Sequence, residues 1–144
     1  MSEKRKVLCP HCEGSLNPSN KIILGAKKSE TNQSGLVLLS PTPGHYHAIT
    51  DDSFPLTSGE KLELFCTIPG CQKSLQSTKH PSLCHLIIPK NNRKRIIYFA
   101  PDKGQEATFI EDENGKIIKR YGKDQEHYLS DFFDEDLNAQ RFKG

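Results

Sequence analysis

Residues 8–16, LCPHCEGSL, and residues 64–75, LFCTIPGCQKSL, are the two stretches that decide the fold. Each stretch places a pair of cysteines after an apolar residue, and each ends in Ser-Leu. The spacings CxxC and CxxxxC both lie within the range of about two to four intervening residues that structural zinc ligands use. The two stretches are therefore halves of one metal site, two unrelated turns, or a redox pair beside a spare pair.

The metal reading has a chemical basis in the turns themselves. Structural Zn²⁺ takes four tetrahedral nitrogen or sulfur ligands, and a CxxC turn supplies two while its backbone N–H groups donate to the sulfurs. Pro10 presets one backbone torsion, and Gly14 gives freedom where the chain leaves the first turn. The pair Pro69-Gly70 favours a type II turn directly before Cys71, the second cysteine of that stretch. The pattern predicts one shared Zn²⁺ site, with the ligands Cys9, Cys12, Cys66 and Cys71.

The joint pattern CPHC and CTIPGC resembles the zinc-ribbon and rubredoxin-like proteins. That resemblance, which covers only the two cysteine knuckles, implies hairpin ends that share one metal. This sequence departs from the family pattern because the usual Gly after the second cysteine is displaced to Gly14 and the second knuckle is longer. The segment between the knuckles is also large, so it has to fold in a way that brings them together.

Two other readings of the cysteines compete with the metal site. Free cysteines are often buried as small apolar residues, which would make these stretches ordinary turns. CPHC is also compatible with a thioredoxin-like dithiol, but that motif needs a preceding strand and a following helix. Here it lies close to the N-terminus and is followed by the turn sequence EGSLNPSN. The context therefore favours the metal site over the redox pair.

Composition agrees with a soluble protein that has a modest core. The chain has 144 residues, of which 34% are hydrophobic and 26% are charged, and it contains neither a secretory apolar run nor a membrane-spanning window. We therefore expect a cytoplasmic protein without membrane contact, whose thiols stay reduced. Five cysteines then give four ligands and one remaining residue, Cys84.

Short β-type runs between Gly, Pro, Asn and Ser predict a mainly β fold with a C-terminal helix. We expect a single zinc-binding domain over 1–144. It divides into zinc-ribbon-like knuckles with a large β insertion over 1–82, an antiparallel meander over 83–122, and a C-terminal helix and tail over 123–144. Asn91-Asn92 and Asn114-Gly115 mark hairpin turns, and Asp124 is a possible N-cap for a helix extending to Gln140. The expected strands are 21–25, 35–40, 45–50, 61–66, 83–89, 95–100, 107–112 and 116–121.

Two histidines suggest an alternative function as a metal-dependent enzyme. His45 and His47 would face the same side of a strand and could ligate a second metal. No local spacing fixes a third ligand, so a polar edge strand is the favoured explanation of the two histidines. Cys84 and His85 point to opposite faces of an expected strand and so cannot form a nucleophile and base pair.

A basic hairpin tip provides a candidate nucleic-acid surface. Residues 66–100 hold six Lys or Arg and no Asp or Glu, whereas 101–144 hold seven basic and eleven acidic residues. Clustered cations beside an aromatic ring suit RNA or single-stranded DNA, although such charges also protect edge strands from aggregation. The residues concerned are Lys90, Arg93, Lys94, Arg95 and Tyr98.

The expected C-terminal helix offers a second surface, on which its aromatic face caps the sheet or docks a protein partner. Together these features predict a non-catalytic, zinc-stabilised module that binds nucleic acid, a ribonucleoprotein or a protein.

Overall fold

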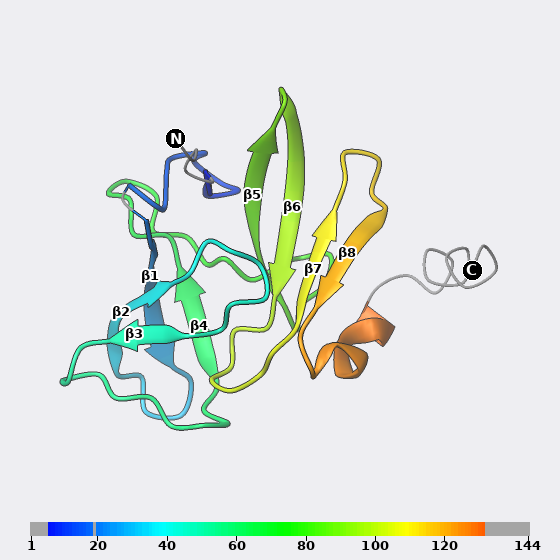
Figure 1. Cartoon of the computed structure of the whole chain (residues 1–144). Helices are drawn as coiled ribbons and strands as arrows, with labels where there is room; N and C mark the ends of the chain where they lie inside the picture. The colour runs from blue at the N-terminus through cyan, green and yellow to red at the C-terminus, as the bar shows by residue number, and fades with distance from the viewer. Residues whose placement is uncertain (1–5, 19, 132–144) are drawn as a thin grey trace.

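The computed structural model describes residues 6–18 and 20–131, and these form two four-stranded antiparallel sheets (Figure 1). The first sheet has the strand order β3-β2-β1-β4 and the second has the order β5-β6-β7-β8. The strands are β1 (Ile22–Lys28), β2 (Ser34–Leu39), β3 (Ala48–Thr50), β4 (Leu62–Phe65), β5 (Cys84–Lys90), β6 (Arg93–Phe99), β7 (Thr108–Glu111) and β8 (Ile117–Tyr121). The described chain is thus mainly β, in agreement with that part of the sequence prediction.

Alternation of apolar residues fixes the inner face of the first sheet. In β1 the side chains of Ile22, Leu24 and Ala26 are buried, and the residues between them are half-buried. The period of two places one set of side chains on each face of the sheet. β1 pairs with β2 on one edge and with β4 on the other. The long segment between the two cysteine stretches therefore folds into a sheet that carries the second stretch at the end of β4.

The second sheet is the meander that the turn signals predict. Asn91 and Asn92 both have positive φ, 53° and 65°, between β5 and β6. The β7–β8 connection differs from the expected two-residue turn. It is a longer loop, closed by a hydrogen bond from Gly115 N to the Asp112 carbonyl (3.0 Å), and Gly115 has a φ of 83°. A turn followed by a left-handed glycine is the other common hairpin geometry.

The main core lies where the inner faces of the two sheets meet. Leu24, Val37 and Leu64 of the first sheet are buried in one cluster with Cys84 and Leu86 of the second. A smaller cluster, which includes Leu83, Tyr98 and Phe109, covers the opposite face of the second sheet. The molecule thus has one core between the two sheets and a second, smaller hydrophobic cluster on the outer face of the second sheet.

The prediction of a C-terminal α-helix is wrong for the residues that the structure describes. These contain only a 3-10 helix, η1 (Gln125–Asp131), and residues 132–144 lie outside the described part of the chain. The Asp124 carboxylate does not cap a helix but accepts a hydrogen bond from Glu106 N, at 3.0 Å. The Tyr128 hydroxyl donates to Gln105 Oε1 (3.0 Å). These contacts with the 105–106 loop hold residues 124–128 against the second sheet. The helix propensities of this segment are intermediate, so they do not favour an α-helix strongly enough to outweigh these contacts.

Candidate metal centre

The four predicted cysteines converge on one point. Their Sγ atoms all lie within 4.8 Å of one another. Cys9 and Cys71 are 3.8 Å apart, and Cys12 and Cys66 are 3.9 Å apart. A tetrahedron with Zn–S bonds of about 2.3 Å has edges of about 3.8 Å, whereas a disulfide needs about 2.05 Å. The spacing therefore suits a shared metal ion and not two disulfides.

The two knuckles are built alike although their lengths differ. Cys9 N donates to the Gly14 carbonyl and Cys66 N donates to the Lys73 carbonyl, both at 3.0 Å. The acceptor is in each case the second residue after the second cysteine. His11 N lies 3.3 Å from Cys9 Sγ, and Ile68 N lies 3.4 Å from Cys66 Sγ. Backbone N–H groups directed at sulfur stabilise thiolate ligands.

The repeated Ser-Leu ending closes each knuckle. Leu16 N donates to the Val7 carbonyl and Leu75 N donates to the Leu64 carbonyl, both at 2.8 Å. In each pair the acceptor is two residues before the first cysteine and the donor is four residues after the second. All four side chains are in the main core. The two sequence stretches are therefore copies of one small hairpin, with a buried base and a cysteine tip.

The displaced glycine has a structural explanation. The residue directly after the second cysteine has positive φ in both knuckles, 59° at Glu13 and 52° at Gln72. Glycine adopts this conformation without a steric penalty, whereas other residues incur about 1–2 kcal/mol. Gly14 instead lies against the other knuckle, because a Cβ there would overlap the Ile68 side chain. Gly14 thus lets the Ile68 side chain of the other knuckle pack directly against the backbone at this position.

Each knuckle is hydrogen-bonded to both sheets, since Ile23 N of β1 donates to the Leu16 carbonyl (2.8 Å) and His85 N of β5 donates to the Leu75 carbonyl (2.9 Å). Leu8 N donates to the Ile87 carbonyl (2.8 Å) and Ile87 N donates to the Leu8 carbonyl (2.9 Å), which joins the first knuckle to β5. The second knuckle follows β4 directly, since Cys66 comes after Phe65. A metal held by both knuckles would therefore reinforce a junction between the two sheets that backbone hydrogen bonds already make.

Burial and hydrogen bonding shift the pKa values of the ligand thiols in different directions. Burial raises the pKa of Cys9, and it raises the pKa of Cys66 to about 12. The backbone N–H of Lys73 lowers the pKa of Cys71, whose sulfur is nearer to solvent. Metal ligation requires thiolates. A bound cation would offset the cost of burying the negative charges of Cys9 and Cys66, so these two thiols ionise most readily when the metal binds. Four sulfur donors in a tetrahedral arrangement fit Zn²⁺ or iron.

The other candidate ligands do not assemble into a site. Among residues 6–18 and 20–131, the four cysteines are the single group of three or more His, Cys, Asp or Glu residues whose ligand atoms converge. His45 and His47 are both exposed and lie before β3, outside the strand in which we expected them. Cys84 is buried in the main core, whereas His85 lies on the opposite face against Tyr98.

The basic tip projects at the β5–β6 turn, beyond the rest of its sheet (Figure 1). Arg93 pairs with Glu113 (3.1 Å), and Lys94 pairs with Glu13 of the first knuckle (2.9 Å). Lys90 is exposed and Arg95 is half-buried. Tyr98, which we expected to stack on bases, is only 4% exposed.

The Tyr98 hydroxyl donates to Glu111 Oε1 at 3.2 Å, and the Tyr98 ring meets the His80 ring edge-on, with 4.9 Å between the centroids. The aromatic ring is therefore not at the surface, and the tip offers cations alone.

Sequence reasoning missed a cavity between the two sheets, where Tyr46, Phe99 and Glu106 come together from three separate segments. No spacing in the sequence marks them, because their proximity depends on how the sheets pack.

The described residues include no helix that is long and apolar enough to cross a membrane. Comparison of the chain with models of known protein families, with curated proteins and with solved structures gives no match.

Proposed function

We propose that Cys9, Cys12, Cys66 and Cys71 hold one structural Zn²⁺ and that the chain acts as a non-catalytic, zinc-stabilised binding module. The observation that carries this proposal is the convergence of four thiols from two hairpins of matching construction. Four cysteines are one of the usual ligand sets of structural zinc sites, which supports the choice of zinc.

The ligand set supports a structural role for the metal. Catalytic zinc sites keep three protein ligands and leave the fourth position to water or substrate. Here four cysteines complete a tetrahedron, and Cys9 and Cys66 are buried. A saturated ion of this kind has no open position for a substrate, so its contribution is to the fold.

The binding surface that we propose is the basic tip, with RNA or single-stranded DNA as the partner. Lys90, Arg93, Lys94 and Arg95 gather at the projecting turn. Exposed ion pairs such as Lys94–Glu13 contribute only about 0–1 kcal/mol, so a phosphate can replace the carboxylate.

The buried position of Tyr98 narrows the proposal to phosphate contacts without base stacking. Binding of this kind is independent of sequence and strongly salt-dependent. Four phosphate contacts to a single strand give a slope of log K against log salt of about −3.

Two experiments test the two parts of the proposal separately. Protein purified without added metal is expected to contain one equivalent of zinc, and Cys71→Ser is expected to lose it. Full occupancy in that variant, or iron in place of zinc, contradicts the metal assignment.

For the surface, binding of a fluorescent single-stranded RNA is measured at low salt. Combined Arg93→Gln, Lys94→Gln and Arg95→Gln substitution is expected to abolish binding. The control is the same charge change on exposed cations elsewhere, at Lys119, Arg120 and Lys123. Equal binding by the two triple variants rules out the tip.

A further inference from the structure

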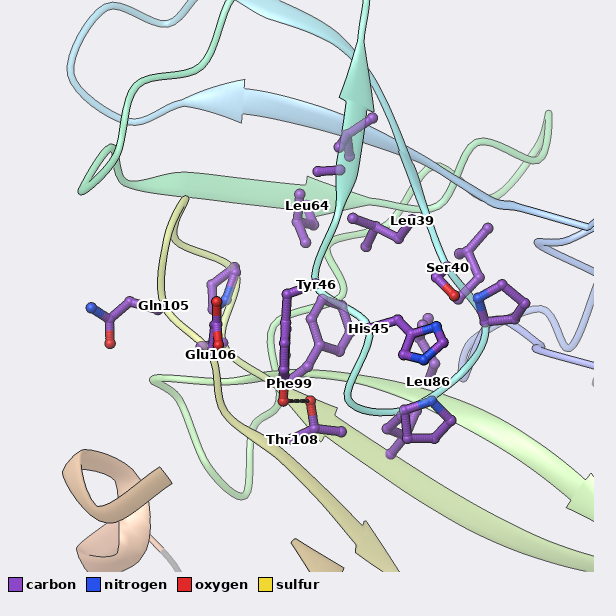
Figure 2. A pocket seen from close by; sticks show the side chains of 18 of the residues that line it. Leu39, Ser40, His45, Tyr46, Leu64, Leu86, Phe99, Gln105, Glu106 and Thr108 are labelled. Carbon is purple, nitrogen blue, oxygen red and sulfur yellow. Dashed lines mark hydrogen bonds between the residues drawn. The ribbon is translucent and has the colours of Figure 1, made fainter. Parts of the chain in front are cut away.

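A cavity of about 210 Å³ lies between the inner faces of the two sheets. Leu39 of β2, Ala48 of β3 and Leu64 of β4 form the wall on one side, and Leu86 of β5 and Phe99 of β6 form it on the other. Figure 2 shows the side chains of Leu39, Leu64, Leu86 and Phe99 directed into a common space. The interior of the cavity is therefore aliphatic and aromatic, and it belongs to neither the metal centre nor the basic tip.

Polar groups gather at the mouth of this cavity, where residues 40–46 and 100–106 cross it. The hydroxyls of Tyr46 and Thr108 are hydrogen-bonded at 2.8 Å (Figure 2). Glu106 lines the mouth as well, and its backbone is held on both sides by Asp124. Glu106 N donates to Asp124 Oδ2 (3.0 Å), and Asp124 N donates to the Glu106 carbonyl (2.9 Å).

These bonds hold the backbone of Glu106, whereas its carboxylate has no ion pair or hydrogen bond within the described residues. It is half-buried, so it retains only part of its hydration. Asp102, the other carboxylate of the lining, accepts a hydrogen bond from Leu62 N at 3.3 Å. Lys103 is the one Lys or Arg side chain of the lining.

Two carboxylates against one ammonium give the mouth a negative charge. The pKa of Tyr46 reflects the same field, since burial raises it first and the charges of Glu106 and Asp124 raise it further. A partly dehydrated carboxylate gains most from a cationic partner.

We propose that this cavity binds a small apolar molecule with a single positively charged nitrogen, whose apolar part lies between the sheets and whose nitrogen meets Glu106. Complementary charge at the mouth selects a cation over a neutral or anionic ligand of the same shape. The volume sets the size of the ligand. An apolar cavity of about 150 Å³ holds benzene, so the present cavity accommodates a phenyl ring with a short aminoalkyl chain. Aromatic neighbours such as Tyr46 and Phe99 also favour a cation near their rings.

The test compares three probes of similar size and different charge on the metal-loaded full chain: phenethylammonium, 2-phenylethanol and phenylacetate. Binding is followed by NMR shifts of isotope-labelled protein as each probe is titrated. We expect saturable binding of the ammonium, with perturbed signals from Ala48, Leu64, Leu86 and Thr108. The alcohol is expected to bind at least about tenfold more weakly, because its hydroxyl can donate to Glu106 but carries no positive charge, so the ion pair is lost. The carboxylate is expected to bind most weakly.

Two variants and a control separate the parts of the proposal. Glu106→Gln is expected to reduce ammonium affinity at least about tenfold and to leave the alcohol unchanged. Glu63→Gln removes a carboxylate from the exposed face of β4, away from the cavity, and is expected to have no effect on either probe.

Ala48→Leu fills part of the cavity and is expected to weaken all three probes. Three results overturn the proposal: absence of saturable binding, equal affinity for the three probes, or unchanged ammonium binding in Glu106→Gln.

Discussion

Replacement of Cys66 by serine provides the sharpest test of the metal centre, because the chain supplies a matched control. Cys66 and Cys84 are both buried, with exposed fractions of 2% and 3%, and both are in the main core. Cys66 belongs to the sulfur cluster and Cys84 does not. The pair Cys66→Ser and Cys84→Ser therefore makes the same chemical change at the same depth, with and without loss of a ligand.

The expected magnitudes differ by the contribution of the metal. Each substitution buries a hydroxyl in place of a thiol, which costs about 1–3 kcal/mol of unfolding free energy when the hydroxyl lacks a partner. Cys66→Ser also removes the stabilisation by metal binding. That term is about 4 kcal/mol when free zinc exceeds its dissociation constant about a thousandfold. At about 2–4 °C per kcal/mol for a chain of this size, the two variants should differ in Tm by roughly 8–16 °C.

Thermal unfolding with and without a chelator measures this difference. The wild type and Cys84→Ser should both lose stability when the metal is removed, and by the same amount. Cys66→Ser should unfold at the same temperature in both conditions and should contain less than a full equivalent of metal. If Cys66→Ser still responded to the chelator as the wild type does, the four-thiol site would be refuted.

Three further predictions follow from local geometry. Gly122→Ala should lower the free energy of unfolding by more than the roughly 1–3 kcal/mol that a left-handed conformation costs a non-glycine residue, because a Cβ there overlaps the Glu106 carbonyl. Gly59→Ala is the control, since Gly59 has a similar φ and no atom near its Cβ position, and it should cost only the roughly 1–3 kcal/mol. Urea unfolding measures both. Cys84 should resist iodoacetamide in the folded protein from pH 7 to 9, since burial raises its pKa to about 12 and about one thiol in a thousand or fewer is ionised; rapid native labelling followed by mass spectrometry would contradict this. Burial lowers the pKa of His85, so the unfolded chain binds a proton at this side chain more readily than the folded chain, and the free energy of unfolding falls as pH drops through about 6.5. His85→Gln should flatten the dependence of this free energy on pH, measured by urea unfolding between pH 5.5 and 7.5 at saturating metal. An unchanged slope would exclude the effect.

Most of the sheet structure could be predicted because its signals are local. Alternation in β1 and the Asn91-Asn92 turn involve neighbours in the chain. The same holds for each knuckle, whose ligand spacing and Ser-Leu closure lie within one hairpin. The convergence of Cys9 with Cys66 was predicted from ligand chemistry, since four thiols at such spacings satisfy one tetrahedral ion.

The errors arose where the partner of a residue is distant in sequence. Asp124 has the features of a helix N-cap, but it bonds to Glu106, and Tyr128 bonds to Gln105. Tyr98 has the sequence context of a stacking residue, but His80 and the loop around it cover its ring. Both outcomes depend on how the second sheet is covered on its outer face, which no local pattern determines. The cavity was missed for the same reason, because its lining comes from both sheets.

The metal centre and the cavity share two structural elements. Val7 and Leu64 both line the cavity, and each lies two residues before the first cysteine of a knuckle. A metal that fixes the two knuckles would therefore also restrain these two residues of the cavity lining. Thermodynamic linkage then requires reciprocity: if metal binding organises the cavity, a ligand in the cavity must raise the affinity for the metal by the same factor. Because two short hydrogen-bonded segments connect the sites, the coupling needs no large conformational change.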